Sequence, residues 1–197
     1  MPHVIRNVCV FCGSSPGRGE PYAEAARALG RRLVEENLGL VYGGGSVGLM
    51  GIVADTVLSL GGRAIGVIPH SLKVREVGHA GLTEQHVVDT MHERKTAMAD
   101  RADAFIAMPG GYGTFEEFLE IVTWLQLGIH AKPCGLLNVR GYYDKLLDFL
   151  DHAVGEGFLR PENRRLIVTA ETPDALLAAL RSTQIPPIEP WITRAER

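Results

Sequence analysis

The sequence has few cysteines, no long apolar run and no large excess of charge of either sign, and each absence excludes a class of protein. Three cysteines among 197 residues are too few for a disulfide-stabilised scaffold. No apolar run approaches the roughly 20 residues that are needed to span a bilayer. The amino terminus also lacks the apolar segment of a signal peptide. We therefore expect a cytoplasmic protein without a membrane partner.

Charge and composition fit one globular domain that does not bind nucleic acid. The net charge is −3, and acidic and basic residues are interspersed, so no basic surface for nucleic acid is expected. Hydrophobic residues make up 46% of the chain and charged residues 22%, which is enough for a full core. Because no repeat or long linker divides the chain, we expect a single domain over residues 1–184. An extended, proline-containing tail over residues 185–197 should follow it.

Patterns that bind metals are missing as well. Cys9 and Cys12 have C-x-x-C spacing, but they lie in a strand-like run, where residues three apart point to opposite faces. The seven histidines show no ligand spacing. We expect two buried thiols, no metal and no cofactor; the alternative is redox or zinc chemistry by the cysteine pair.

Short apolar runs that resemble strands alternate with helical patterns along most of the chain. This order is typical of an α/β protein whose parallel sheet is covered by helices on both faces. Ligands of such sheets bind beyond the carboxyl ends of the strands, at the topological switch point. The expected strands are 8–11, 38–42, 64–68, 104–108, 134–137 and 166–168, and the expected helices are 22–36, 48–60, 91–100, 115–127, 142–156 and 173–180.

Three of the strand-to-helix turns are rich in small residues, and they should meet at one edge of the sheet. They occupy residues 13–17, 43–51 and 109–114. The second turn has the spacing of a dinucleotide fingerprint. It does not follow the first strand, however, and no acidic residue lies about 20 positions downstream, so bound NAD is not expected. We expect the three turns to line one crevice with backbone N–H groups.

The third turn, at residues 109–114, predicts an anion site. Its glycines allow the backbone to approach a ligand closely, and the helix that follows adds unpaired N–H groups and a positive dipole end. Glu117 near this helix start is a candidate for chemistry. The alternative is structural: Thr114 and Glu117 have the spacing of a capping box, with Thr114 as the N-cap.

Arg94 is a second candidate. It lies three residues after Met91 and four before Met98, so the three side chains share one face of the expected helix. If the methionines face the core, Arg94 points inward and needs an anionic partner. If they are partly exposed, Arg94 is an ordinary surface charge.

The glycine turns and the residues around Arg94 resemble the LOG ("Lonely Guy") family of cytokinin riboside 5′-monophosphate phosphoribohydrolases, long mislabelled as lysine decarboxylases. The resemblance runs from about Val8 to Phe158. Its motifs are Gly43-Gly44-Gly45-Ser46-Val47-Gly48-Leu49-Met50-Gly51, Met91-His92-Glu93-Arg94-Lys95 and Pro109-Gly110-Gly111-Tyr112-Gly113-Thr114-Phe115-Glu116-Glu117.

The resemblance implies a Rossmann-like fold, a homodimer and hydrolysis of the N-glycosidic bond in an adenosine-type 5′-monophosphate. Arg94 and Glu117 would be the catalytic pair. Together with the glycine turns, it gives a set of expected substrate-binding residues: Gly13, Ser14, Gly44, Gly45, Glu76, Lys95, Gly110, Gly111, Tyr112, Gly113, Thr114, Glu116 and Thr123.

Two other functions remain open at this point. A nucleotide sensor would use the same turns to bind AMP without hydrolysing it. A pyridoxal phosphate-dependent decarboxylase would use Lys95 as its Schiff-base lysine, but the sequence offers no evident acidic partner for the pyridine nitrogen.

Overall fold

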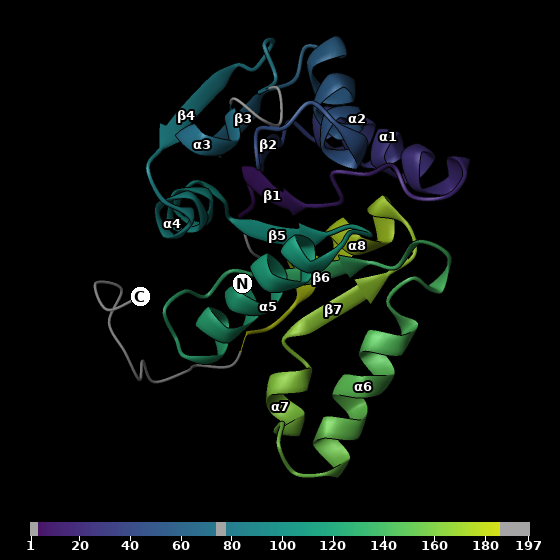
Figure 1. Cartoon of the computed structure of the whole chain (residues 1–197). Coiled ribbons are helices and arrows are strands. Elements are labelled where there is room, and N and C mark those ends of the chain that lie inside the picture. The colour runs from purple at the N-terminus through teal and green to yellow at the C-terminus, as the bar shows by residue number, and fades with distance from the viewer. Residues whose placement is uncertain (1–3, 74–77, 186–197) are drawn as a thin grey trace.

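A computed structural model describes residues 4–73 and 78–185. In this part of the chain, a seven-stranded sheet has the order β4-β3-β2-β1-β5-β6-β7, and every neighbouring pair is parallel. Figure 1 shows the helices packed on both faces, which confirms the predicted α/β class. The strands are β1 (Asn7–Phe11), β2 (Gly39–Tyr42), β3 (Ala64–Pro69), β4 (Glu84–Val88), β5 (Ala104–Ala107), β6 (Cys134–Leu137) and β7 (Ile167–Ala170).

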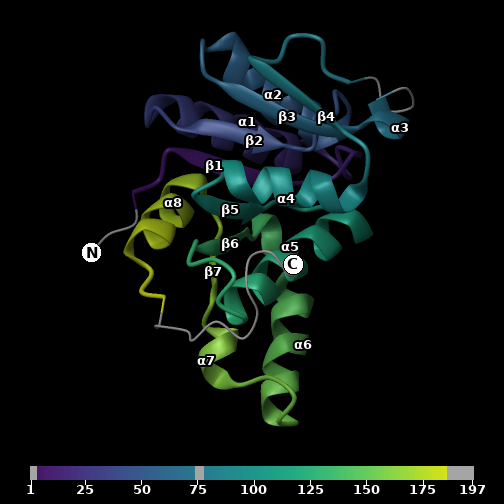
Figure 2. The same cartoon turned by 90° about the vertical axis from the view of Figure 1, so that its left-hand side faces the viewer.

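Each face of the sheet has its own hydrophobic cluster. Helices α1 (Glu20–Glu35), α2 (Gly48–Ser59) and α8 (Pro173–Ser182) pack on one face. Helices α4 (Met91–Arg101) and α5 (Tyr112–Gln126) pack on the other. In both views α6 (Asp144–Gly155) and α7 (Pro161–Arg164) project away from the sheet (Figures 1 and 2). Two short elements, α3 (His70–Lys73) and the 3-10 turn η1 (Val139–Gly141), complete the described part.

The predicted strands and longer helices are all present, within a few residues of their expected bounds. The central strands are buried along their whole length, as continuous apolar runs require. Strand β4, the short helices α3 and α7, and the turn η1 were not predicted. Strand β4 was missed because it lies at the sheet edge, where its polar residues alternate between half-buried and exposed positions.

The cysteines lie where the strand pattern predicted. All three are free and buried. Cys9 faces the α4–α5 cluster and Cys12 the α1–α2 cluster, so the two thiols point to opposite sides of the sheet. The C-x-x-C spacing therefore has a packing explanation.

The chain order places the topological switch point between β1 and β5. From β1 the chain builds outward through β2, β3 and β4, and then returns to place β5 on the other side of β1. A crevice is expected beyond the carboxyl ends of these two strands. No helix in the described residues is long and apolar enough to cross a membrane.

Candidate active site

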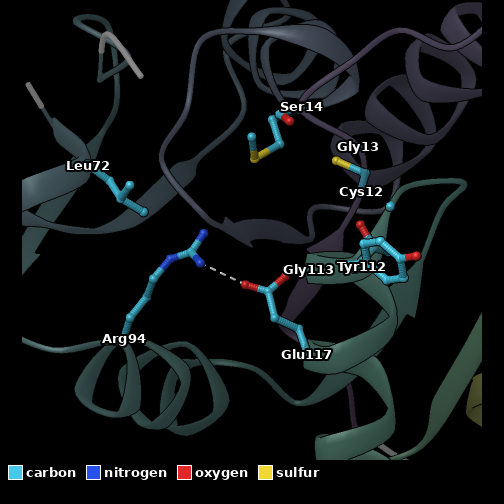
Figure 3. Close-up of a pocket in the computed structure, with 11 residues that line it drawn as sticks. Cys12, Gly13, Ser14, Leu72, Arg94, Tyr112, Gly113 and Glu117 are labelled. Atoms are coloured by element: carbon cyan, nitrogen blue, oxygen red, sulfur yellow. Dashed lines mark hydrogen bonds and ion pairs between the residues drawn. The ribbon is translucent and has the colours of Figure 1, made fainter. Parts of the chain in front are cut away.

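A cavity of about 250 Å³ lies at the switch point. Its volume is close to the lower end of the roughly 300–1,000 Å³ typical of small-molecule sites. Figure 3 shows the side chains that line it, from the end of β1, the start of α5, and helices α2, α3 and α4. The lining residues are Cys12, Gly13, Ser14, Met50, Leu72, Arg94, Gly111, Tyr112, Gly113, Thr114 and Glu117.

Arg94 and Glu117 form a buried ion pair in the wall of this cavity (Figure 3). The Arg94 Nη1 donates to Glu117 Oε1 at 2.8 Å, and Nε donates to the Val67 carbonyl at 3.1 Å. The two residues are 7% and 8% exposed, so the inward orientation of Arg94 is the one the chain adopts. Met98 is buried on the same face, whereas Met91 is exposed. Burial of both charges needs this partnership, because an unpaired ion at the same depth would be costly.

Burial raises the pKa of the Glu117 carboxyl above its ordinary value of 4.5, and the Arg94 guanidinium opposes that rise. The neighbouring Glu116 and Glu120 carboxylates raise the pKa further, while Lys95 lowers it. A carboxylate with a raised pKa is a stronger base than an exposed one. The ion pair also fixes its orientation, so Glu117 is suited to accept a proton or to stabilise a cation in the cavity.

The capping box predicted for Thr114 and Glu117 is wrong. Helix α5 starts at Tyr112, with Gly111 as its N-cap and no side-chain cap, so Thr114 is already the third helical residue. Glycine is tolerated at the N-cap position, so the helix can begin directly after Gly111. Glu117 consequently lies in the second turn, where it cannot cap the helix, and its carboxylate is available to the cavity.

The glycines around the cavity fall into two groups. A Cβ built on Gly111 or Gly113 would meet no protein atom within 4 Å, and neither residue has a positive φ. Protein packing therefore explains neither glycine, whereas a ligand that approaches the backbone would. At Gly43 a Cβ would collide with the Arg94 guanidinium, and at Gly110 with the Thr114 hydroxyl. Those two glycines make room for neighbouring side chains instead.

Lys95 and Glu116 lie beside the cavity and do not line it. The buried Lys95 ammonium bonds to Glu116 at 2.6 Å and to Glu120 at 2.9 Å, which joins α4 to α5 next to the Arg94–Glu117 pair. Burial opposes the charge, but the two carboxylates outweigh it and raise the pKa of Lys95. Lys95 is therefore held as an ammonium ion.

Three other expected residues are not brought to the cavity. Gly44 and Gly45 contact the segment before β4: the Gly44 carbonyl accepts from the His79 amide at 3.1 Å, and Gly45 bridges Gly78. Thr123 is exposed far along α5, and its hydroxyl bonds to the Leu119 carbonyl at 2.8 Å. Glu76 lies outside the described residues.

Three lining residues were not predicted. Cys12 directly follows β1, so the rule for carboxyl ends of parallel strands identifies its position. Met50 belongs to a glycine turn but has no polar group that would have suggested a role in the site. Leu72 lies on α3, which carried no sequence signal. Among residues 4–73 and 78–185, no cluster of three or more histidine, cysteine or acidic side chains could hold a metal ion.

The chain is similar in sequence to a known family and to named plant proteins. A family model described as "Possible lysine decarboxylase" matches residues 50–180. The probable cytokinin riboside 5′-monophosphate phosphoribohydrolase LOGL5 of Oryza sativa subsp. japonica is 56% identical over 93% of this chain and 74% of its own length. The cytokinin riboside 5′-monophosphate phosphoribohydrolase LOG2 of Arabidopsis thaliana is 55% identical over 89% of this chain and 83% of its own length.

Solved structures share the fold at lower sequence identity. The molybdenum cofactor binding protein from Rippkaea orientalis superimposes with a TM-score of 0.67 at 20% identity, covering 90% of this chain and 96% of that protein. The molybdenum cofactor carrier protein from Chlamydomonas reinhardtii gives 0.66 at 21% identity, covering 88% and 94%. These likenesses concern the fold alone. The sequence matches extend over most of the chain, and the chain therefore belongs to the LOG family of cytokinin riboside 5′-monophosphate phosphoribohydrolases.

Proposed function

We propose that this chain hydrolyses the N-glycosidic bond of an N6-substituted adenosine 5′-monophosphate, with AMP itself as a second substrate, to the free base and ribose 5-phosphate. The observation that carries the proposal is the buried Arg94–Glu117 pair, which lines one cavity together with the glycine-rich start of α5. The names of the plant relatives, which specify this activity, support it.

The start of α5 is the proposed phosphate site. Gly111, Tyr112, Gly113 and Thr114 line the cavity there, and the first N–H groups of a helix have no partner within it. Those donors and the positive end of the helix dipole favour a phosphate. Anchoring the 5′-phosphate would hold the ribose in a fixed position relative to Glu117, which lowers the entropic part of the barrier.

Glu117 is the proposed base. Breaking the C1′–N9 bond leaves positive charge on the ribose, as in other glycoside hydrolyses. An ionised Glu117 would stabilise this charge and accept a proton from water, whose oxygen bonds to C1′. The bonding electron pair leaves with N9, which takes up a proton to give the neutral base, and Glu117 gives the proton it accepted back to solvent. Arg94 would keep the carboxylate oriented and oppose the rise of its pKa.

Replacement of the Glu117 carboxylate by an amide tests this assignment. In E117Q the amide keeps the shape of the side chain but cannot act as a base, so we expect release of base from AMP and from isopentenyladenosine monophosphate to fall about 1,000-fold. Free base is measured by chromatography, with E156Q on the exposed end of α6 as the matched control. Turnover near that of the wild type by E117Q would overturn the assignment. Tight AMP binding by the wild type with no release of base would favour the sensor instead.

The decarboxylase alternative fits the geometry poorly. A Schiff base forms only from a neutral amine, but two carboxylates hold Lys95 as an ammonium ion. Lys95 also does not line the cavity. The residues that line the cavity therefore include no lysine suited to the decarboxylation that the name of the family model suggests.

We also propose that the chain forms a homodimer. Support comes from apolar side chains that are exposed on the projecting arm, which consists of α6, α7 and the residues between them. Helix α6 contains no buried residue, and Phe149 on it and Phe158 after it are 64% and 90% exposed. Thr123 is too far along α5 to reach a phosphate at the start of the same helix, since each residue adds about 1.5 Å. Any contact of Thr123 with a substrate phosphate would therefore need a phosphate that is held by a second subunit. The location in the cytoplasm stays a prediction from the sequence.

A further inference from the structure

Three consecutive carbonyl groups at the end of β5 are each held by a donor from another element. The Met108 carbonyl accepts from the Tyr143 hydroxyl at 2.6 Å, and the Pro109 carbonyl accepts from the Gly13 amide at 3.1 Å. The Gly110 carbonyl accepts from the Tyr142 hydroxyl. Neither tyrosine has a role in the chemistry described above, yet both contact the backbone immediately before the proposed phosphate site.

The back of this segment is otherwise poorly packed. An apolar cavity of about 290 Å³ lies behind it, lined by Pro109, Gly110 and Gly111 together with the rings of Tyr22 and Tyr142. Side-chain packing therefore does little to fix these peptides from that side. The hydrogen bonds to the carbonyls must set their orientation instead.

The geometry of the peptide bond links Tyr142 to the phosphate site. In a trans peptide the C=O of one residue and the N–H of the next point in opposite directions. Tyr142 lines the rear cavity and not the reaction cavity, whereas Gly111 lines both. With the Tyr142 hydroxyl on the Gly110 carbonyl, the Gly111 N–H points away from Tyr142. Gly111 has open space where a Cβ would lie, so protein packing does not fix the peptide on that side. A specific restraint is therefore needed to keep its orientation.

The segment that presents Tyr142 is itself tightly defined. Arg140 and Gly141 both have positive φ, at 55° and 68°, which is uncommon for arginine. The buried Asn138 closes the turn: its Oδ1 accepts from the Tyr143 amide and its Nδ2 donates to Asp144, both at 2.7 Å. Such conformations persist only where surrounding contacts impose them. The turn thus delivers the two hydroxyls to fixed positions.

We propose that Tyr142 is a positioning residue for phosphate binding, because its hydroxyl holds the Gly110 carbonyl and so aims the Gly111 amide at the 5′-phosphate. The proposal rests on the proposed function only in its choice of ligand. Tyr143 provides a contrast within the same turn. The peptide after Met108 ends in a proline nitrogen, which has no hydrogen, so fixing the Met108 carbonyl aims no donor.

Binding measurements on three phenylalanine variants test the proposal without relying on turnover. Dissociation constants for ribose 5-phosphate and for adenosine, which lacks the phosphate, are measured by calorimetry on wild type, Y142F, Y143F and Y22F. We expect Y142F to bind ribose 5-phosphate about fivefold more weakly, the effect of one lost hydrogen bond, with adenosine binding unchanged. Y143F should melt a few degrees lower but bind both ligands normally. Y22F, which alters the same rear cavity, should behave like wild type.

Several results would overturn the proposal. They are normal binding of ribose 5-phosphate by folded Y142F, equal weakening of both ligands, or the same selective loss in Y143F. As a second measurement that needs no variant, the Gly111 amide proton of the wild type should move downfield in NMR spectra when ribose 5-phosphate is added; an unmoved resonance also contradicts the proposal. Because these are binding readouts, a wild type that binds ribose 5-phosphate but releases no base would refute the proposed hydrolysis and leave the role of Tyr142 standing.

Discussion

The substitution of Gly113 by alanine should make the protein more stable and less active. Gly113 is the second residue of α5, a Cβ there would meet no protein atom within 4 Å, and its φ is not positive. Glycine inside a helix costs about 0.5–1 kcal/mol relative to alanine. In a domain of this size, we therefore expect G113A to melt about 1–4 °C higher than the wild type.

The same methyl group should interfere with phosphate binding. If the phosphate approaches the backbone at Gly113, a Cβ would prevent the closest approach and weaken at least one charge-assisted hydrogen bond, worth about 1.5–3 kcal/mol. The expected loss in kcat/KM is roughly 10- to 100-fold. Gly111 is a poorer test position, because it is the N-cap of α5 and alanine is unfavourable there.

Thermal unfolding and release of base from AMP would be measured side by side. G155A is the matched control, since Gly155 ends α6, its Cβ would also meet nothing within 4 Å, and it does not line the cavity. It should leave activity unchanged. If G113A raised the melting temperature and kept full kcat/KM, the phosphate could not lie at the start of α5, and the argument from its glycines would fail.

Two further predictions concern the ion pair and the oligomer. Because burial raises the pKa of Glu117 and a base must be deprotonated, kcat/KM should fall as the pH decreases through an apparent pKa above 4.5. R94Q removes the opposing charge and should move this decline to higher pH. An unchanged pH profile in R94Q would contradict the role of Arg94. If the arm is the dimer contact, light scattering should give twice the monomer mass for the wild type and a lower mass for the doubly substituted F149D/F158D, whereas F149D/F158D with wild-type mass would place the contact elsewhere.

The fold was predictable because its signals are local. The central strands are apolar along their whole length, and the longer helices between them carry their own periodic patterns, so each element could be identified within a short window. Arg94 illustrates the limit of such signals. Its position on the α4 face allowed either burial or exposure, and only the Glu117 carboxylate, brought from α5, accounts for a guanidinium that is buried.

The capping box failed for a related reason. Thr114 and Glu117 have the right spacing, but the helix begins earlier, with Gly111 at the N-cap, a position where glycine is tolerated. A Thr-x-x-Glu sequence does cap α4, where the Thr90 hydroxyl accepts a hydrogen bond from the Glu93 amide at 3.1 Å. The two motifs look alike in sequence. They differ in the residues just before them, which at α5 are glycines.

The glycine turns show most clearly what a motif leaves undetermined. The turn at residues 43–51 was expected to offer backbone donors to a ligand, like the turn at residues 109–114. Instead Gly43 makes room for the Arg94 guanidinium, and Gly48, with φ 59°, lets its loop pack against the Ser14 backbone. Both turns border the same cavity. The turn at residues 109–114 is proposed to contact the ligand, whereas the glycines at 43 and 48 act through Arg94 and the β1 loop. Substitution at Gly43 should therefore displace Arg94 and reduce catalysis, whereas substitution at Gly113 should reduce phosphate binding.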